Sequence, residues 1–232
     1  KSNYGDNYKD SLNQALTSAG YKNLSEYRQR MIKQIQYANF LLDYIDDHFD
    51  DVFNDYYQQC APKYVSLIKI SVSDTSSPTD DETSKLNEVK ELISNTDKSF
   101  GDIAQDYSDD STSSKKGSLG IVDSKDTSGI ANSYGKDVFN AIEALSEGQV
   151  SDVITGDDGY YFVKVTSTDK KTLKKELKKT DIDSPLLAYD DYLQYVVYNS
   201  YKINYKDKDI KKIVQEVVNK ALEERKTERG EA

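Results

Sequence analysis

The single cysteine and the single histidine, Cys60 and His48, are the first candidates for nucleophilic chemistry. A cysteine acts as a nucleophile when a base lies within hydrogen-bond reach of its thiol. Both residues fall in one predicted helical region, and their spacing does not bring the imidazole to the sulfur. The sequence therefore favours a free, partly buried thiol near a helix end.

Acidic residues surround His48 in the stretch Asp46-Asp-His-Phe-Asp-Asp51. Carboxylates and imidazole bind metals, but this spacing does not specify a coordination geometry. A solvated junction between two helices explains the same residues. We therefore expect no metal at this stretch and no cofactor in the chain.

A third candidate is Asp110, which lies in a polar loop over residues 108–118. A short helix is predicted before this loop, because apolar residues recur there at spacings of three and four. After the loop, Gly117 and Gly120 bracket Leu119, as in a tight turn that enters a strand. A loop aspartate is often only solvated, so its role depends on the module that carries it.

The whole stretch from Lys98 to Val122 resembles the central signature of the parvulin-type peptidyl-prolyl isomerases. The matching residues are Phe100, Ile103, Ala104, Tyr107 and Ser108, then Asp109-Asp110 and Gly117-Ser-Leu-Gly120. Further stretches that resemble the family are Val65–Val72, Ala141–Ser151 and Gly159–Val165. The resemblance covers residues 63–167.

The resemblance implies a proline pocket above two histidines, with an aspartate or cysteine beside the bound peptide. Lys69 and Tyr161 occupy the two histidine positions, and Asp110 the aspartate or cysteine position. These three are the expected catalytic residues. A lysine and a tyrosine do not reproduce a pair of neutral imidazoles. We therefore expect weak or absent isomerase activity, with an active, remodelled site as the alternative.

The family's pocket also implies four substrate-binding positions. The aromatic position maps to Val138 or, with a slip of one residue, to Phe139. The methionine that often lines the pocket maps near Tyr134, and Leu119 belongs to the glycine turn.

Hydrophobic periodicity predicts the elements that hold these residues. Residues 1–60 are predicted to be helical, with an amphipathic helix stopped by Gly20 and a longer one capped by Asn23 or Ser25. The fold class is α+β, a β-α-α-β-α-β-β insert flanked by a helical lobe. The predicted elements of the insert are strands 65–72, 119–122 and 160–166, an extended segment near 150–154, and helices 83–93, 100–107 and 138–145.

Both flanks of the insert are predicted to be helical and too small to bury their apolar faces alone. We expect residues 1–62 and 168–232 to form one lobe and residues 63–167 to form the parvulin-like domain. Residues 168–179 are predicted as a linker or short solvated helix, 185–198 as one helix, and 223–232 as a frayed tail. Exchange of helices with a second copy, giving a homodimer, stays open.

This arrangement is similar to the PrsA-type foldases, and the tail Tyr205–Lys212 resembles their ending. That resemblance implies a lipid-anchored chaperone on the outer face of the membrane of a Gram-positive bacterium. Its partners would be unfolded or partly folded secreted polypeptides. The chain begins in a polar segment, so we interpret it as a trimmed fragment whose anchor lies upstream of Lys1.

Composition limits the partners. The net charge is −10, which argues against nucleic acid, because its binding relies on basic patches. No run approaches the ~20 apolar residues of a membrane-spanning helix. The 19 tyrosines suit amphipathic contacts with unfolded chains, or are ordinary core and surface residues. A surface adhesive module is a third hypothesis.

Overall fold

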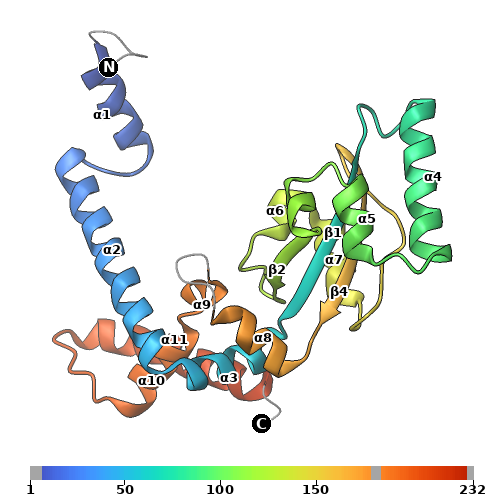
Figure 1. The fold of residues 1–232 in the computed structure, drawn as a ribbon. Helices are drawn as coiled ribbons and strands as arrows, with labels where there is room; N and C mark the ends of the chain where they lie inside the picture. The colour runs from blue at the N-terminus through green and yellow to red at the C-terminus, as the bar shows by residue number, and fades with distance from the viewer. Residues whose placement is uncertain (1–6, 179–183, 229–232) are drawn as a thin grey trace. The chain divides into compact units, whose positions relative to one another are not determined.

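A computed structural model describes residues 7–178 and 184–228. The chain divides into two compact units, Lys1–Phe49 and Asp50–Ala232 (Figure 1). Each unit is described by itself below.

The first unit holds two helices, α1 (Tyr8–Ser18) and α2 (Leu24–Asp47). The predicted stop at Gly20 is confirmed, since this glycine has φ +79° in the turn between them. The predicted cap of α2 is also confirmed, because the Asn23 side chain accepts a hydrogen bond of 2.9 Å from the Glu26 amide. His48 ends α2, at the predicted break between helices.

The apolar face predicted for α2 is only partly buried. Its expected members were Tyr27, Met31, Ile35, Ala38, Leu42 and Ile45. Ile35 is 61% exposed, and the buried residues of the helix are Leu41 and Ile45. Of these six residues only Ile45 is buried, and Leu41 is the second buried residue of the helix.

The second unit begins with α3 (Phe49–Cys60) and then forms a four-stranded antiparallel sheet. The strands are β1 (Lys63–Ser71), β2 (Ser118–Val122), β3 (Ile154–Thr155) and β4 (Gly159–Ser167), in the order β2-β1-β4-β3. The helices between them are α4 (Asp80–Asn95), α5 (Phe100–Tyr107), α6 (Ile130–Tyr134) and α7 (Lys136–Ala144). The α+β class is confirmed. Helix α6 is not among the predicted elements, and its Ile130 is buried.

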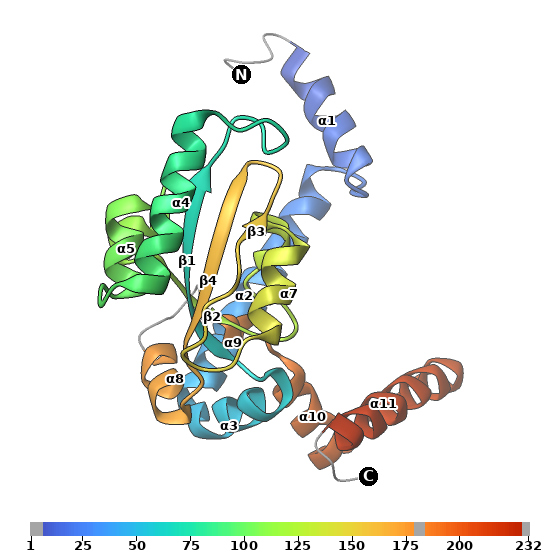
Figure 2. The ribbon, with the colours of Figure 1, turned by 90° about the vertical axis from the view of Figure 1, so that its right-hand side faces the viewer.

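Alternating residues of β1 supply the two cores of this sheet. Val65 and Leu67 join the core beneath α6 and α7. Ile68 and Ile70 join the core beneath α4 and α5 on the opposite face. Figure 2 shows α4 and α5 on one side of the strands and α7 on the other. Lys69 therefore points to the α6–α7 face, where a lysine must find a partner.

After the sheet the chain is helical again, with three differences from the prediction. These elements are α8 (Lys170–Leu177), α9 (Pro185–Ala188), α10 (Asp191–Ser200) and α11 (Lys208–Glu228). Helix α8 is not solvated, because Leu173 and Leu177 are fully buried, whereas Lys179 lies outside the described residues. The single helix predicted over 185–198 is two, since buried Tyr189 ends α9.

The third difference concerns the end of the chain. Residues 223–228 are not frayed but continue α11, while 229–232 lie outside the described residues. Arg225 forms an ion pair with Asp55 of α3, whose side chain is 5% exposed. The Tyr189 hydroxyl donates to the same carboxylate at 2.6 Å. Polar contacts, which hydrophobic periodicity does not report, therefore hold this end in place.

Cys60 ends α3 and is fully buried, more deeply than predicted. Burial, followed by the nearby Asp123 charge, raises the pKa of its thiol to about 12. Its carbonyl accepts from the Ser124 amide at 2.9 Å. The thiol is thus protonated at neutral pH and unsuited to nucleophilic chemistry. Within the described residues, no helix combines the length and apolarity needed to span a membrane.

Candidate functional site

Lys69 and Tyr161, two of the predicted catalytic residues, lie directly opposite each other on β1 and β4. The Lys69 ammonium lies 5.7 Å from the centroid of the Tyr161 ring. Asp158, in the turn before β4, accepts from both side chains: it forms an ion pair with Lys69 and a hydrogen bond with the Tyr161 hydroxyl. These two donors hold the pKa of Asp158 below its usual range.

Tyr134 and Asp110 continue this set of contacts. The Tyr134 ring, at the end of α6, meets the Tyr161 ring edge-on, with centroids 6.2 Å apart. Its hydroxyl lies close enough to the Asp110 carboxylate for that charge to act on the phenol. Burial, followed by the Asp110 charge, raises the pKa of Tyr134 to about 12. Burial and the bond to Asp158 likewise raise the pKa of Tyr161, so both phenols stay protonated at neutral pH.

The loop that carries Asp110 is fixed by its own hydrogen bonds. The carboxylate accepts from the amide and hydroxyl of Thr112, at 2.8 and 2.7 Å, and so caps the 3-10 turn Ser111–Lys115. Ser108 accepts from the Lys69 amide at 3.0 Å, and the Asp109 amide donates to the Lys69 carbonyl at 2.8 Å. The loop is thus anchored to β1 at Lys69 itself.

Gly117 lets this loop approach the sheet. It has φ +76°, and a Cβ built there would lie 2.4 Å from the Leu67 carbonyl oxygen and 2.8 Å from the Ala104 Cβ. The glycine of the motif is therefore required by the close approach of two backbones.

The four predicted substrate-binding residues belong to the same core. Val138 is 1% exposed and lies in the cluster that contains Tyr161. Leu119, Tyr134 and Phe139 are partly buried against that cluster. Phe139, the alternative to Val138, is the more accessible of the two.

All seven predicted residues thus gather on one face of the sheet, and Asp158 is the member that the sequence analysis missed. It lies in the turn Asp157-Asp-Gly159, just before β4. The signal was present, because this turn leads into the strand that carries Tyr161, opposite Lys69.

The contacts define what this arrangement can do chemically. Rotation about a prolyl amide needs a grip on the ring and support for a less polar, twisted bond, without proton transfer. The apolar side chains could supply such a grip. However, the Lys69 ammonium and the Tyr161 hydroxyl are both engaged with the Asp158 carboxylate. Among the described residues, no group of three or more His, Cys, Asp and Glu side chains could hold a metal ion.

Comparison with known proteins gives matches for the same region. Residues 67–167 match the rotamase family model described as the PPIC-type PPIase domain. The Foldase protein PrsA of Staphylococcus aureus is 32% identical over 141 residues, which are 58% of this chain and 41% of that protein. The Foldase protein PrsA of Staphylococcus epidermidis is also 32% identical over 141 residues.

The chain thus spans about two fifths of the length of these curated relatives. Among solved structures, the crystal structure of PrsA from Bacillus subtilis is 23% identical, covering 90% of this chain and 74% of that one, with a TM-score of 0.40.

Proposed function

We propose that this protein assists the folding of other polypeptides, because residues 67–167 match the PPIC-type PPIase domain and the chain is similar to Foldase protein PrsA. Its partners are unfolded or partly folded secreted chains, which it binds outside the cytoplasm. A lipid anchor attached upstream of Lys1 holds the protein at the outer face of the membrane. Segments 1–62 and 168–232 supply the chaperone lobe.

We further propose that its isomerase activity is weak or absent. The observation that carries this proposal is the ion pair between Lys69 and Asp158, with the Tyr161 hydroxyl on the same carboxylate. A bound peptide would have to break these contacts before it could use either side chain. The prolyl barrier is roughly 18–20 kcal/mol, and a site whose donors are already occupied offers the twisted bond little support.

A second candidate function is isomerisation by a remodelled site. The observation that favours it is that Asp110, Tyr134 and the apolar residues Val138, Phe139 and Leu119 still gather around Tyr161. In this alternative, the apolar cluster grips the proline ring, and Asp110 lies beside the peptide.

Two measurements on the same sample separate these candidates. The first follows cis–trans relaxation of a short Xaa-Pro peptide with increasing protein, and the second follows aggregation of a reduced, unfolded client protein. Suppressed aggregation with relaxation at the uncatalysed rate supports the foldase proposal. Relaxation that accelerates in proportion to protein concentration supports the remodelled enzyme. Failure to suppress aggregation contradicts the chaperone role.

A further inference from the structure

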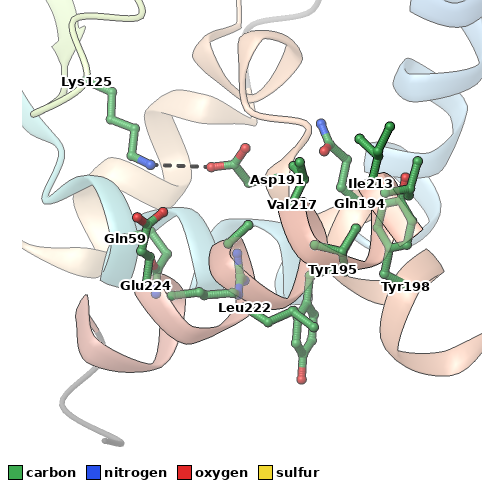
Figure 3. A pocket seen from close by; sticks show the side chains of 14 residues that line it. Gln59, Lys125, Asp191, Gln194, Tyr195, Tyr198, Ile213, Val217, Leu222 and Glu224 are labelled. Carbon is green, nitrogen blue, oxygen red and sulfur yellow. Dashed lines mark hydrogen bonds and ion pairs between the residues drawn. The ribbon is translucent and has the colours of Figure 1, made fainter. Parts of the chain in front are cut away.

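A groove between α10 and α11 is separate from the site on the sheet. It is a cavity of about 400 Å³, within the usual range for ligand sites. Its apolar lining comes from one side of α11 and from two tyrosines of α10: Ile213, Val214, Val217, Val218, Ala221, Leu222, Tyr195 and Tyr198. Figure 3 shows Tyr195 and Tyr198 beside Ile213, Val217 and Leu222. Ile213 and Val217 are more than 60% exposed, so this lining is open to a partner.

Two buried donors line the same groove. The Gln59 amide nitrogen has no hydrogen-bond partner within the described part of the chain. The same is true of the Arg225 Nε, although the side chain of Arg225 is only 10% exposed. A buried donor without an acceptor is unfavourable, because it has lost its hydrogen bonds to water. A ligand that brought acceptors to these two nitrogens would recover part of that cost.

The charges around the groove favour a neutral acceptor over an anion. Arg225 is offset by Asp55, and Lys125 lies 3.4 Å from Asp191 (Figure 3). The remaining lining carboxylate, Glu224, has Lys220 at 3.4 Å. Since each cation at the groove already has a carboxylate beside it, a ligand carboxylate would meet no free positive charge. Peptide carbonyls accept hydrogen bonds without adding charge.

We propose that the α10–α11 groove binds an uncharged, apolar stretch of extended polypeptide. Its side chains lie on the apolar side of α11, and its backbone carbonyls accept from Gln59 and Arg225. This inference rests on the proposed foldase function. In it, the α10–α11 groove is the part of the lobe that contacts a client, and it prefers uncharged, apolar client segments.

The first test measures binding of a fluorescent apolar heptapeptide with blocked ends to the full chain. Val217→Asp places a charge on the groove at a position 63% exposed, so the fold should tolerate it. We expect the Kd of this variant to rise about tenfold. Ile210→Asp is the matched control, because Ile210 is 55% exposed on the same helix and does not line the groove. Equal effects of the two substitutions, or an unchanged Kd for Val217→Asp, would overturn the proposal.

The second test addresses the donors and the preference for a neutral ligand. Gln59→Glu replaces the amide donor by a carboxylate, and its control is Gln215→Glu on the exposed surface of α11. We expect about tenfold weaker peptide binding for the first and little change for the second. Dodecanoate, an apolar anion, should displace the peptide poorly. Displacement by dodecanoate at concentrations below those of the unlabelled peptide would show selection for an anion and refute the assignment.

Aggregation of an unfolded client, measured on the same samples, separates this inference from the proposed function. If the wild type suppresses aggregation but Val217→Asp leaves the peptide Kd unchanged, the groove proposal is refuted and the foldase proposal stands. Peptide binding that depends on Val217 and Gln59 without suppression supports the groove and contradicts the foldase proposal. Absence of both activities contradicts both. Circular dichroism of each variant first establishes that it is folded.

Discussion

At the scale of single residues, the polar side chains of the site are paired with other residues of the protein. Lys69 and Tyr161 share Asp158, and Thr112 donates two hydrogen bonds to Asp110. The sequence identified Lys69, Tyr161 and Asp110 but not Asp158, because motif positions are local, whereas a shared carboxylate depends on which strands pair. No local pattern states that the turn before β4 lies beside Lys69.

The first prediction restores the imidazoles that the family resemblance implies. The double variant Lys69→His/Tyr161→His should accelerate relaxation of an Xaa-Pro peptide at least tenfold over the parent chain. The reason is that both residues lie opposite each other on the strands, as a pair of imidazoles requires. The control Lys69→Met/Tyr161→Phe removes the same polar contacts without adding imidazole and should not accelerate relaxation. Equal rates for both double variants would contradict the prediction.

The second prediction concerns acid stability and Asp158. Its pKa is lowered in the folded state, so its contribution to stability is present above its unfolded pKa of about 3.9 and is lost as the pH falls through the lower folded value. Asp158→Asn should therefore reduce the free energy of unfolding at pH 7 by about 0.5–1 kcal/mol, the range of an ion pair whose carboxylate is exposed to solvent.

Urea denaturation at pH 7 and at pH 2.5 measures this effect. The difference in unfolding free energy between wild type and Asp158→Asn should shrink at the lower pH, because the stabilisation by this carboxylate is lost as the pH falls. Asp157→Asn, at the exposed neighbouring position of the same turn, is the control. A gap that is equal at both pH values would mean that packing, not charge, explains the loss.

At the scale of elements, hydrophobic periodicity predicted which helices and strands exist better than it predicted where they end or which of their residues are buried. The strand and helix pattern of the insert was predicted because β1 alternates and α5 has a regular apolar face. Helix α6 was missed because its five residues carry only one buried side chain, Ile130. Helix α8 was taken as solvated because its many lysines outweigh Leu173 and Leu177 in any composition-based reading.

The third prediction concerns the glycine turn between the loop and β2. Gly117→Ala should destabilise the second unit by about 2–3 kcal/mol or more, because a Cβ at φ +76° also meets the Leu67 carbonyl oxygen and the Ala104 side chain. Gly120→Ala is a matched control, since Gly120 has φ +80° but no atom within 4 Å of the added Cβ. It should cost only about 1–2 kcal/mol. Chemical denaturation measures the free energy of unfolding of both variants. An equal decrease for Gly117→Ala and Gly120→Ala would show that the close contact at Gly117 costs no stability.

At the scale of the whole molecule, segments far apart in sequence meet in the second unit. Tyr56 of α3 donates to buried Asp123, which follows β2, at 2.7 Å. Asp55, one residue earlier, meets Tyr189 and Arg225. These buried polar contacts join α3 to the sheet module on one side and to the last helices on the other. Sequence alone could not supply them, because the partners are separated by more than sixty residues.

The fourth prediction breaks the longest of these connections. Arg225→Met leaves Asp55 buried without its cation and should cost about 3–5 kcal/mol in the free energy of unfolding. The double variant Asp55→Asn/Arg225→Met should recover part of this loss, because no uncompensated charge then remains.

Thermal and urea denaturation of the two variants measure this coupling. Arg28→Met, on the first unit, is a surface control with no ion pair among those identified in the described residues. Strict additivity of the Asp55→Asn and Arg225→Met effects would contradict a direct coupling between the two side chains.

The ion pair between Asp55 and Arg225 also has a consequence for the order in which the chain folds during synthesis. The carboxylate leaves the ribosome 170 residues before the guanidinium, a delay of roughly ten to thirty seconds at about 5–20 residues per second. The sheet closes with residues 63–167, well inside that interval. During this interval, the sheet module of the nascent chain is complete, but α11 has not been synthesised. The apolar residues that it would cover are exposed. During that stage, the protein proposed here to help other chains fold would itself expose unfolded apolar surface.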